Sequence, residues 1–407
     1  MPYFLCILLL AATVALAAAT LTASGLRRLG FPLPAADRRI GCVDGLRGYL
    51  ALSVMIHHFF IWIQSTRLGG SWRPPDINIL NELGAGGVAL FFMTTGLVFY
   101  PRILSGLRTT SWPTVYITRI FRILPLVAVS VSIVTAIIIL RTGDAPDRSY
   151  IGSAAHWLSA WSEPNLLGYA DSGRINAYVL WSLKFEWIFY LLLLPICAAA
   201  MDGVRYFKFP TWTTPVLLLV GSLVGRVVLS LRHVHLDFLQ YLPLFAIGML
   251  AFECQSRQRF AELLTKPAAG IGAGLALVLG MSAAQFPYTL ALPFFGIFFI
   301  TVACGNSLGG LLTTRGALVL GECSFGLYLL HGIILDILFT DAKPLFDSLK
   351  TGNVPTLLPV VMVAAVLTAA TTYLIIERPM IRLGRWLARW FVGRGIRITN
   401  PEAEVAP

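Results

Sequence analysis

Long runs of apolar residues constrain this chain more than any other feature of its sequence. A helix needs about 20 mainly apolar residues to cross the hydrocarbon layer of a bilayer. Eleven segments reach or approach that length: residues 3–25, 46–64, 84–101, 118–140, 178–201, 212–231, 236–253, 268–285, 287–304, 316–339 and 355–376. The sequence therefore predicts an all-α fold, a polytopic bundle of transmembrane helices.

Composition excludes the soluble classes of protein. Hydrophobic residues make up 57% of the chain, charged residues 13%, and the mean hydropathy is +0.76. A soluble globular chain has about 25% charged residues, so this one lacks the polar side chains to cover a water-facing surface. The six cysteines show no C-x-x-C spacing, which favours small buried thiols over disulfides or metal ligands. Motifs of soluble nucleotide-binding and metalloprotease enzymes are absent, and no metal or bound cofactor is expected.

The distribution of Lys and Arg predicts how the bundle is oriented. If the residues before segment 46–64 are cytoplasmic, 20 positive charges lie in cytoplasmic connections and the C-terminal tail, against 8 on the other side. The positive-inside rule then places the C-terminus in the cytoplasm. Residues 3–25 resemble a signal peptide, but Arg27 and Arg28 follow them directly. Cleavage would leave those two charges outside, so we expect an uncleaved helix with its N-terminus outside.

One predicted span carries both an arginine and a histidine inside the bilayer. Arg47 and His58 are eleven residues apart, which on a helix gives about 16 Å of rise and a deviation of roughly 20° from a common face. Arg47 is expected at the cytoplasmic rim and His58 near the bilayer centre, while His57 faces elsewhere. Ionisable residues at that depth are costly and usually functional. The alternative is a snorkelling arginine and a histidine satisfied by a neighbouring helix.

Two other spans place ionisable residues at similar depth. Glu186 lies about 12 Å into segment 178–201, close to the level expected for His58. Lys184 is two residues away and points to a different face, which disfavours a pair within the helix. His331 is deep in its segment, about two turns after Glu322. A buried histidine of this kind is also compatible with a purely structural role.

Two arginines stand at the cytoplasmic start of segment 118–140. Arg119 and Arg122 have i,i+3 spacing and therefore share one helix face. Two guanidinium groups can each bind phosphate oxygens bidentately, so the pair suits a phosphate-bearing ligand. Positive-inside anchoring is the alternative interpretation of the same two residues.

In this order, these elements resemble the acyltransferase 3 family, the O-antigen-acetylase-like integral membrane acyltransferases, over about residues 39–395. The resemblance rests on six motifs: DGLRGYLALSVMIHH, GGVALFFMTTG with Thr95 where serine is usual, TRIFRILP, WSLKFEWIFY, LGECSFGLYLLH with Phe325 replacing the usual tyrosine, and IERPM. The family has a core of ten spans that starts at the arginine–histidine helix. It implies three parts for this chain: an added helix and basic linker (1–38), a membrane acyltransferase domain (39–395) and a cytoplasmic tail (396–407).

The resemblance implies an enzyme that moves an acyl group, probably acetyl, from acyl-CoA as co-substrate to a hydroxyl of a cell-envelope or exported carbohydrate or glycolipid. His58 is the implied general base, with an acyl-histidine intermediate as the variant. Arg47, Arg119 and Arg122 would bind the acyl-CoA. The acceptor pocket would include His331, Glu186 and Trp181, and Glu186 would either orient His58 or bind acceptor hydroxyls.

A second class of protein shares the buried charges. A polytopic transporter or flippase of a glycan or lipid also carries ionisable residues near the bilayer centre. Cleavage of an acyl-CoA thioester separates the two hypotheses. In either case we expect a multi-pass protein of the bacterial inner membrane, without nucleic-acid partners.

Overall fold

The computed structural model describes residues 2–34, 41–234, 236–283, 286–288 and 290–394, and within them it is helical and contains no strand. The predicted cytoplasmic tail 396–407 lies outside the described residues, as do residues 35–40, which include the end of the predicted basic linker and the start of the predicted acyltransferase domain. The α-helices are α1 (Pro2–Arg28), α2 (Gly41–Arg67), α3 (Asn78–Ser105), α4 (Trp112–Thr142), α5 (Arg148–Leu158), α6 (Trp181–Ile188), α7 (Leu194–Tyr206), α8 (Thr213–Leu231), α9 (Leu242–Gln255), α10 (Gln258–Leu264), α11 (Pro267–Ala283), α12 (Leu292–Ala303), α13 (Arg315–Glu322), α14 (Ser324–Asp336), α15 (Leu358–Thr372) and α16 (Arg378–Arg394).

Short segments of other helical types connect these helices. Three are π-helical: η4 (Phe189–Leu193), η7 (Ile337–Asp341) and η10 (Tyr373–Glu377). The 3₁₀ segments are η2 (Leu166–Gly168), η3 (Ser172–Asn176), η5 (Asp237–Gln240), η6 (Leu311–Thr313), η8 (Lys343–Leu345) and η9 (Thr351–Leu357).

The predicted polytopic bundle is confirmed, with one weak span. Among the described residues, nine helices are long and apolar enough to cross a membrane, or ten if α10 and α11, bent by 74°, form one broken span. Segment 287–304 becomes α12, which has only 12 residues. That length gives about 18 Å of rise, less than a hydrocarbon layer of about 30 Å. Segment 355–376 becomes longer than predicted, because η10 joins α15 to α16.

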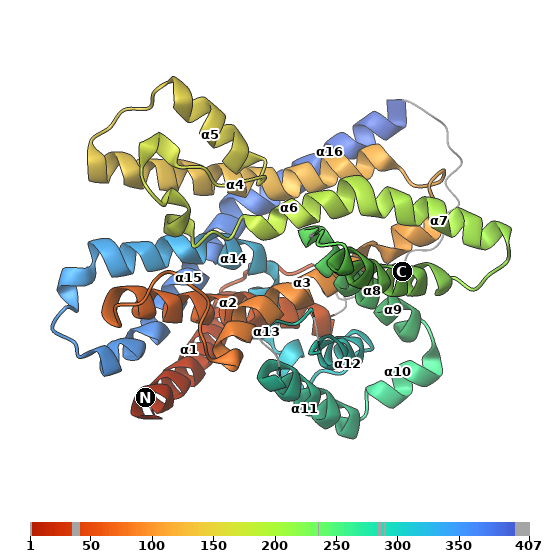
Figure 1. Cartoon of the computed structure of the whole chain (residues 1–407), viewed down its shortest axis with the longest axis horizontal. Coiled ribbons are helices and arrows are strands. Elements are labelled where there is room, and N and C mark those ends of the chain that lie inside the picture. The colour runs from red at the N-terminus through yellow and green to blue at the C-terminus, as the bar shows by residue number, and fades with distance from the viewer. Residues whose placement is uncertain (1, 35–40, 235, 284–285, 289, 395–407) are drawn as a thin grey trace.

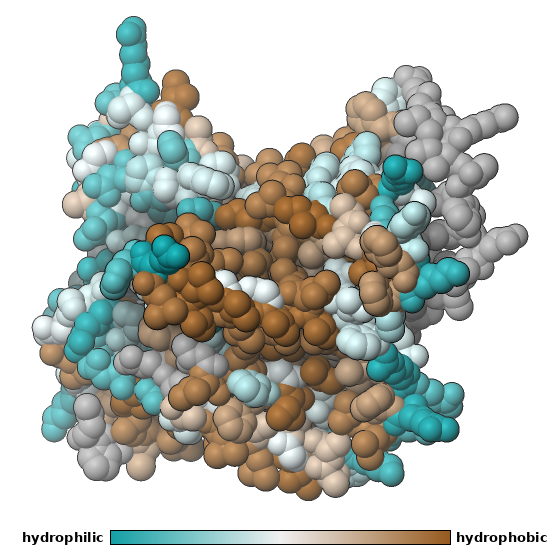
Figure 2. Space-filling model, turned by 45° about the vertical axis from the view of Figure 1, so that its right-hand side comes forward, coloured by the Kyte–Doolittle hydropathy of each residue, from teal (hydrophilic) through white to brown (hydrophobic). Residues whose placement is uncertain are grey.

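The surface of the bundle is apolar between two polar ends. Helices α4, α6, α7 and α16 run side by side across the upper half of Figure 1. Figure 2 shows a band of hydrophobic side chains across the middle of the molecule, with hydrophilic side chains at both ends of it. This distribution fits a bilayer, where a helix satisfies its own backbone hydrogen bonds and exposes apolar side chains to lipid.

Glycines allow the central helices to approach closely. Helix α3 packs on α9, and the two meet at Gly96 and Gly248. A Cβ on Gly96 would overlap the carbonyl oxygen of Phe245, and a Cβ on Gly248 would overlap that of Met93. Small residues at such crossings bring backbones together in membranes, where lipid-excluded packing drives association.

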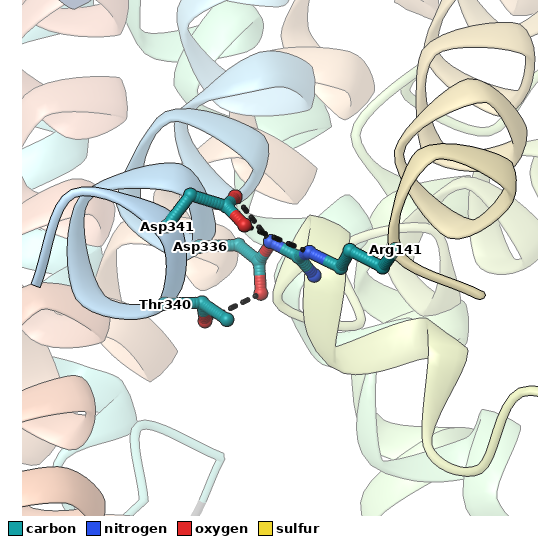
Figure 3. Close-up of polar contacts among 4 residues, drawn as sticks. All are labelled: Arg141, Asp336, Thr340 and Asp341. Carbon is teal, nitrogen blue, oxygen red and sulfur yellow. Dashed lines mark hydrogen bonds and ion pairs between the residues drawn. The ribbon is translucent and has the colours of Figure 1, made fainter. Parts of the chain in front are cut away.

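An ion-pair cluster fixes α4 against the end of α14 (Figure 3). The Nη2 atom of Arg141 lies 2.6 Å from Oδ2 of Asp336 and 2.6 Å from Oδ2 of Asp341, and its Nε donates to Oδ1 of Asp341 at 3.1 Å. Thr340 donates to the other oxygen of Asp336 at 3.4 Å. Because α14 also carries His331, this cluster sets the position of that histidine relative to α4.

Candidate active site

Two histidines from distant parts of the chain form a stacked, hydrogen-bonded pair. Helix α2 supplies His58 and α14 supplies His331. Their ring centroids are 5.0 Å apart with an interplanar angle of 29°, and Nδ1 of His58 lies 2.9 Å from Nε2 of His331. His331 is fully buried, whereas His58 keeps part of its surface accessible.

The hydrogen bonds of this pair assign the protons. Nδ1 of His331 lies 3.1 Å from the carbonyl oxygen of Leu327, which can only accept, so that nitrogen carries the proton. In the neutral ring, Nε2 of His331 is then an acceptor, and Nδ1 of His58 donates to it. The remaining nitrogen of His58, Nε2, therefore has a free lone pair. A neutral imidazole held in this tautomer can accept a proton.

His57 has a different environment, as the helix geometry predicts. Its Nδ1 lies 2.8 Å from the carbonyl oxygen of Leu80, and its ring fills the space left by the missing side chain of Gly84. It is buried between α2 and α3. These contacts describe a packing histidine whose hydrogen bond is satisfied.

A cavity of about 590 Å³ lies beside the histidine pair and receives most of the predicted ligand-binding residues. Seven α-helices, the π-helical segments η4 and η10, and the connection between α1 and α2 contribute to its walls. The polar and charged residues that line it are Asp44, Arg47, Thr94, Thr95, Thr118, Arg119, Arg122, Ser182, Glu186, Tyr190, Glu322, Ser324, Tyr328, Tyr373, Arg378, Arg382 and Arg385. A volume of this size is typical of a site for a small organic ligand.

Glu186 stands on the wall of this cavity among arginines. Its Oε1 accepts a long hydrogen bond from Thr95 at 3.5 Å, and its Oε2 accepts from Tyr190 at 3.4 Å. The positive charges of Arg119 and Arg47 act on its carboxyl group. The hydrogen-bonding partner of His58 is thus His331, while Glu186 belongs to the arginine cluster.

The two arginines of α4 occupy different surroundings. Arg122 forms an ion pair with Glu377 at 3.1 Å, and the carboxyl group of Glu377 is fully buried. Glu377 ends the π-helical segment η10, which overlaps the end of the last predicted span. Arg119 packs its guanidinium over the ring of Phe99 at 5.1 Å and near that of Tyr190 at 5.9 Å. Both arginines line the cavity, as does Arg47, which pairs with Asp44 at 3.6 Å.

Tyr328 and Ser182 close the cavity on the side of the histidines. The hydroxyl groups of these two residues are 2.8 Å apart, and the hydroxyl of Tyr328 also donates to the Val179 carbonyl oxygen at 3.2 Å. The ring of Tyr328 is 6.1 Å from that of His331. Neither His58 nor His331 is among the lining residues, so the histidine pair lies behind this tyrosine. Sequence reasoning missed both hydroxyl residues, although each stands within a quoted motif.

Of the three residues predicted for an acceptor pocket, Glu186 lines the cavity, whereas His331 and Trp181 do not. Trp181 belongs to an aromatic cluster. Its ring packs against those of Phe185 and Tyr241, at centroid distances of 5.9 and 5.8 Å. It stays partly exposed on the surface of the bundle.

Sequence reasoning also missed a set of arginines beyond the last predicted span. Arg378, Arg382 and Arg385 line the cavity, because α16 folds back along α4 (Figure 1). Their spacing of four and three residues, which places side chains on one face of a helix, was the available signal. The sequence predicts these three arginines only as cytoplasmic positive charges after the last span.

Comparison with known proteins places this site within a described domain. The model of a family described as an acyltransferase domain matches residues 40–376. That range includes Arg47, His58, Glu186 and His331, and it ends just before α16. No curated protein and no solved structure matches the chain.

Proposed function

Since this chain belongs to the acyltransferase 3 family, we propose that it transfers an acetyl or other short acyl group from acyl-CoA to a hydroxyl group of a carbohydrate or glycolipid. The observation that carries this proposal is the pair formed by His58 and His331, which leaves one lone pair of His58 free. A nitrogen in that state is suited to take the proton of an attacking hydroxyl group.

The proposed step is a single acyl transfer. Nε2 of His58 takes the proton of the acceptor hydroxyl, and the oxygen attacks the thioester carbonyl carbon. The tetrahedral intermediate then collapses, the C–S bond breaks, and the thiolate of CoA leaves and takes up the proton from His58. The products are the acyl ester and free CoA, so atoms and charges balance. An acyl-histidine intermediate is the variant, in which Nε2 of His58 attacks the thioester itself.

The proposed role of His331 is to hold His58 in the active tautomer. When His58 becomes protonated, its Nδ1–H still donates to Nε2 of His331, so the ring keeps its orientation throughout the step. His331 is in turn held by the carbonyl oxygen of Leu327. This chain of two hydrogen bonds supplies the orientation that a carboxylate gives to the histidine in other acyl-transfer enzymes.

The cavity is the proposed site of the acyl donor. Its arginines provide positive charge at one end, and Tyr328 with Ser182 closes it at the other. A donor that binds its phosphates at the arginines would extend a thioester toward these two hydroxyl groups. Glu186 would then balance part of the arginine charge and keep Arg47 and Arg119 in place. Movement of the Tyr328 side chain would bring the thioester to His58.

We propose that the arginine end faces the cytoplasm, where acyl-CoA is available, in a bacterial inner membrane. The positive-inside distribution of Lys and Arg supports this orientation. The acceptor would then reach His58 from the opposite side, as expected for an envelope or exported carbohydrate.

The experiment that tests this function follows thioester cleavage and ester formation together. The purified protein in lipid vesicles is given acetyl-CoA and mixed envelope glycans, and released thiol and acetylated glycan are measured. We expect both products in equal amounts. Uptake of glycan without thiol release would favour a transporter and overturn the proposal. Mass spectrometry of envelope glycans from a deletion strain would identify the acceptor by the loss of one acyl group.

A further inference from the structure

The six arginines of the cavity fall into two groups by their partners. The arginines of the inner group have partners within the protein: Arg47 pairs with Asp44, Arg122 pairs with Glu377, and Arg119 lies over aromatic rings. The second group, Arg378, Arg382 and Arg385 on α16, forms no hydrogen bond or ion pair with any residue that the structure describes.

Exposure places the second group at the mouth of the cavity. The side chains of Arg47 and Arg122 are only 28% and 18% exposed, whereas Arg382 and Arg385 are exposed residues. Three unpaired guanidinium groups that share one cavity mouth repel one another. This arrangement costs free energy unless an anion with several charges binds between them.

The helix that carries these arginines is held in a fixed position. At Gly384, a Cβ would come within 2.6 Å of Cβ of Phe121 on α4, so the two backbones approach closely there. The π-helical segment η10 precedes α16 and turns Glu377 toward Arg122 and Tyr373 toward Glu322, at 3.1 and 2.9 Å. The start of α16 is thus anchored on both sides, which fixes the face that its arginines present.

The same mouth has an apolar part. Pro32, Leu33 and Pro34, in the connection between α1 and α2, also line the cavity. Rigid apolar side chains of this kind can pack against the flat face of a purine ring. The mouth therefore combines a cationic surface with an apolar one, and both are built by segments outside the matched range 40–376.

We propose that Arg378, Arg382 and Arg385 bind the phosphates of a 3′-phosphorylated adenosine diphosphate, the nucleotide end of coenzyme A, with the purine against residues 32–34. The proposal rests on the proposed function, since it assigns the donor's outer half to this mouth. Phosphate binding, which the sequence predicts for Arg119 and Arg122 on α4, is thereby assigned to the arginines of α16. The inner arginines then act on the middle of the donor and on Glu186.

A phosphate at this position has two possible sources. A 3′-phosphate carries about −1.5 to −2 charges at pH 7, but anionic lipid headgroups also present phosphate to arginines at a membrane surface. The two sources differ in one respect that can be measured. Only the nucleotide makes binding depend on the presence of the 3′-phosphate.

The test measures equilibrium binding, so that it does not require turnover. Binding of CoA and of 3′-dephospho-CoA is compared for the unmodified protein and for the double variant Arg382→Gln/Arg385→Gln, in vesicles of zwitterionic lipid and in vesicles that also contain anionic lipid. Arg389→Gln is the matched control, because it makes the same change on α16 at a residue that does not line the cavity. Thermal unfolding confirms that each variant is folded.

We expect the unmodified protein to prefer CoA over 3′-dephospho-CoA by at least about 10-fold. The double variant should lose about 10- to 100-fold in affinity for CoA and nearly all of that preference, and Arg389→Gln should keep both. An unchanged preference in the double variant would overturn the proposal while leaving the proposed function intact. A loss that appears only when anionic lipid is present would assign the arginines to lipid headgroups. Failure of the unmodified protein to bind CoA would reject the donor assignment itself.

Discussion

The Nδ1 atom of His58 lies 2.9 Å from the Nε2 atom of His331, although the two residues are separated by 273 positions in the chain. Because Nδ1 of His331 donates to the Leu327 carbonyl, this contact determines which nitrogen of His58 is free. The pair connects α2 to α14 at the level where the cavity ends at Tyr328.

Replacing His331 should affect turnover more than donor binding. In His331→Ala, the ring of His58 loses the acceptor that orients it, and we expect kcat to fall by about 10²-fold while KM for acyl-CoA stays nearly constant. His331→Gln should retain more activity, because its side-chain oxygen can accept from Nδ1 of His58. Steady-state measurement of thiol release checks both variants. A kcat of His331→Ala equal to that of the unmodified protein would show that His331 does not orient the base.

Arg122 and Glu377 should contribute to the free energy of unfolding as a coupled pair, so that removing one partner costs more than removing both. The carboxyl group of Glu377 is fully buried, so Glu377→Met leaves a charged Arg122 without its counter-ion. We expect a loss of about 3 kcal/mol in the free energy of unfolding. The double variant Arg122→Met/Glu377→Met should recover much of that loss. Denaturation in detergent gives all four values of the cycle, and strictly additive effects would contradict a coupled pair.

The sequence predicted the members of the site better than their arrangement. Helical spacing related Arg47 to His58 within one helix, and both residues lie on α2. The pairing of His58 with His331 was beyond sequence reasoning, because it depends on how α2 and α14 rotate against each other. Glu186 was expected either to orient His58 or to bind the acceptor. The structure places it among arginines and gives His331 as the hydrogen-bonding partner of His58, so only the role at the acceptor stays a prediction.

The boundaries of the membrane spans could also be predicted only in part. Hydropathy found the apolar segments, but it could not show that α12 has only 12 residues or that α10 and α11 bend by 74°. It also ended the last span near Ile376, where the π-helical segment η10 continues the chain into α16. Three cavity arginines therefore lay beyond the last predicted span without an expected role, since nothing in their local sequence shows that α16 returns to α4.

The contact between α3 and α9 should tolerate no added methyl group. We expect Gly96→Ala and Gly248→Ala to lower the melting temperature, because each Cβ would overlap a backbone carbonyl oxygen of the other helix. Gly225→Ala on α8 is the matched control, since no atom lies within 4 Å of its added Cβ. Thermal unfolding in one detergent compares the three variants. Equal melting temperatures would mean that α3 and α9 can separate without cost.

Glu163 should make stability depend on pH. It lies between α5 and α6, outside the membrane-spanning segments, and its Oε1 accepts from the backbone N–H of Leu180 at 3.0 Å. Burial raises the pKa of this carboxyl group to about 8. The folded state therefore keeps a proton that the unfolded chain releases near its ordinary pKa of about 4.3, so this stabilisation is full below that pKa and is lost as the pH rises toward 8.

Glu163→Gln removes that titration and keeps the oxygen that accepts from Leu180. We expect it to melt at a higher temperature than the unmodified protein at pH 8, with a smaller difference at pH 5. Glu262→Gln, at an exposed position of α10, is the control for the loss of one charge. A difference for Glu163→Gln that stays constant between pH 5 and pH 8 would contradict a buried, protonated carboxyl group.

The most direct test of the account compares neighbouring histidines on α2. His58→Ala and His57→Ala make the same change one residue apart, but only His58 pairs with His331, whereas His57 donates to Leu80 and packs on Gly84. Thiol release from acetyl-CoA is measured with acceptor present, after CoA binding confirms that each variant is folded. We expect His58→Ala to lower kcat by at least about 10²-fold and His57→Ala to retain most of it. Transfer by His58→Ala at the rate of the unmodified protein would contradict the assignment of His58 as the base.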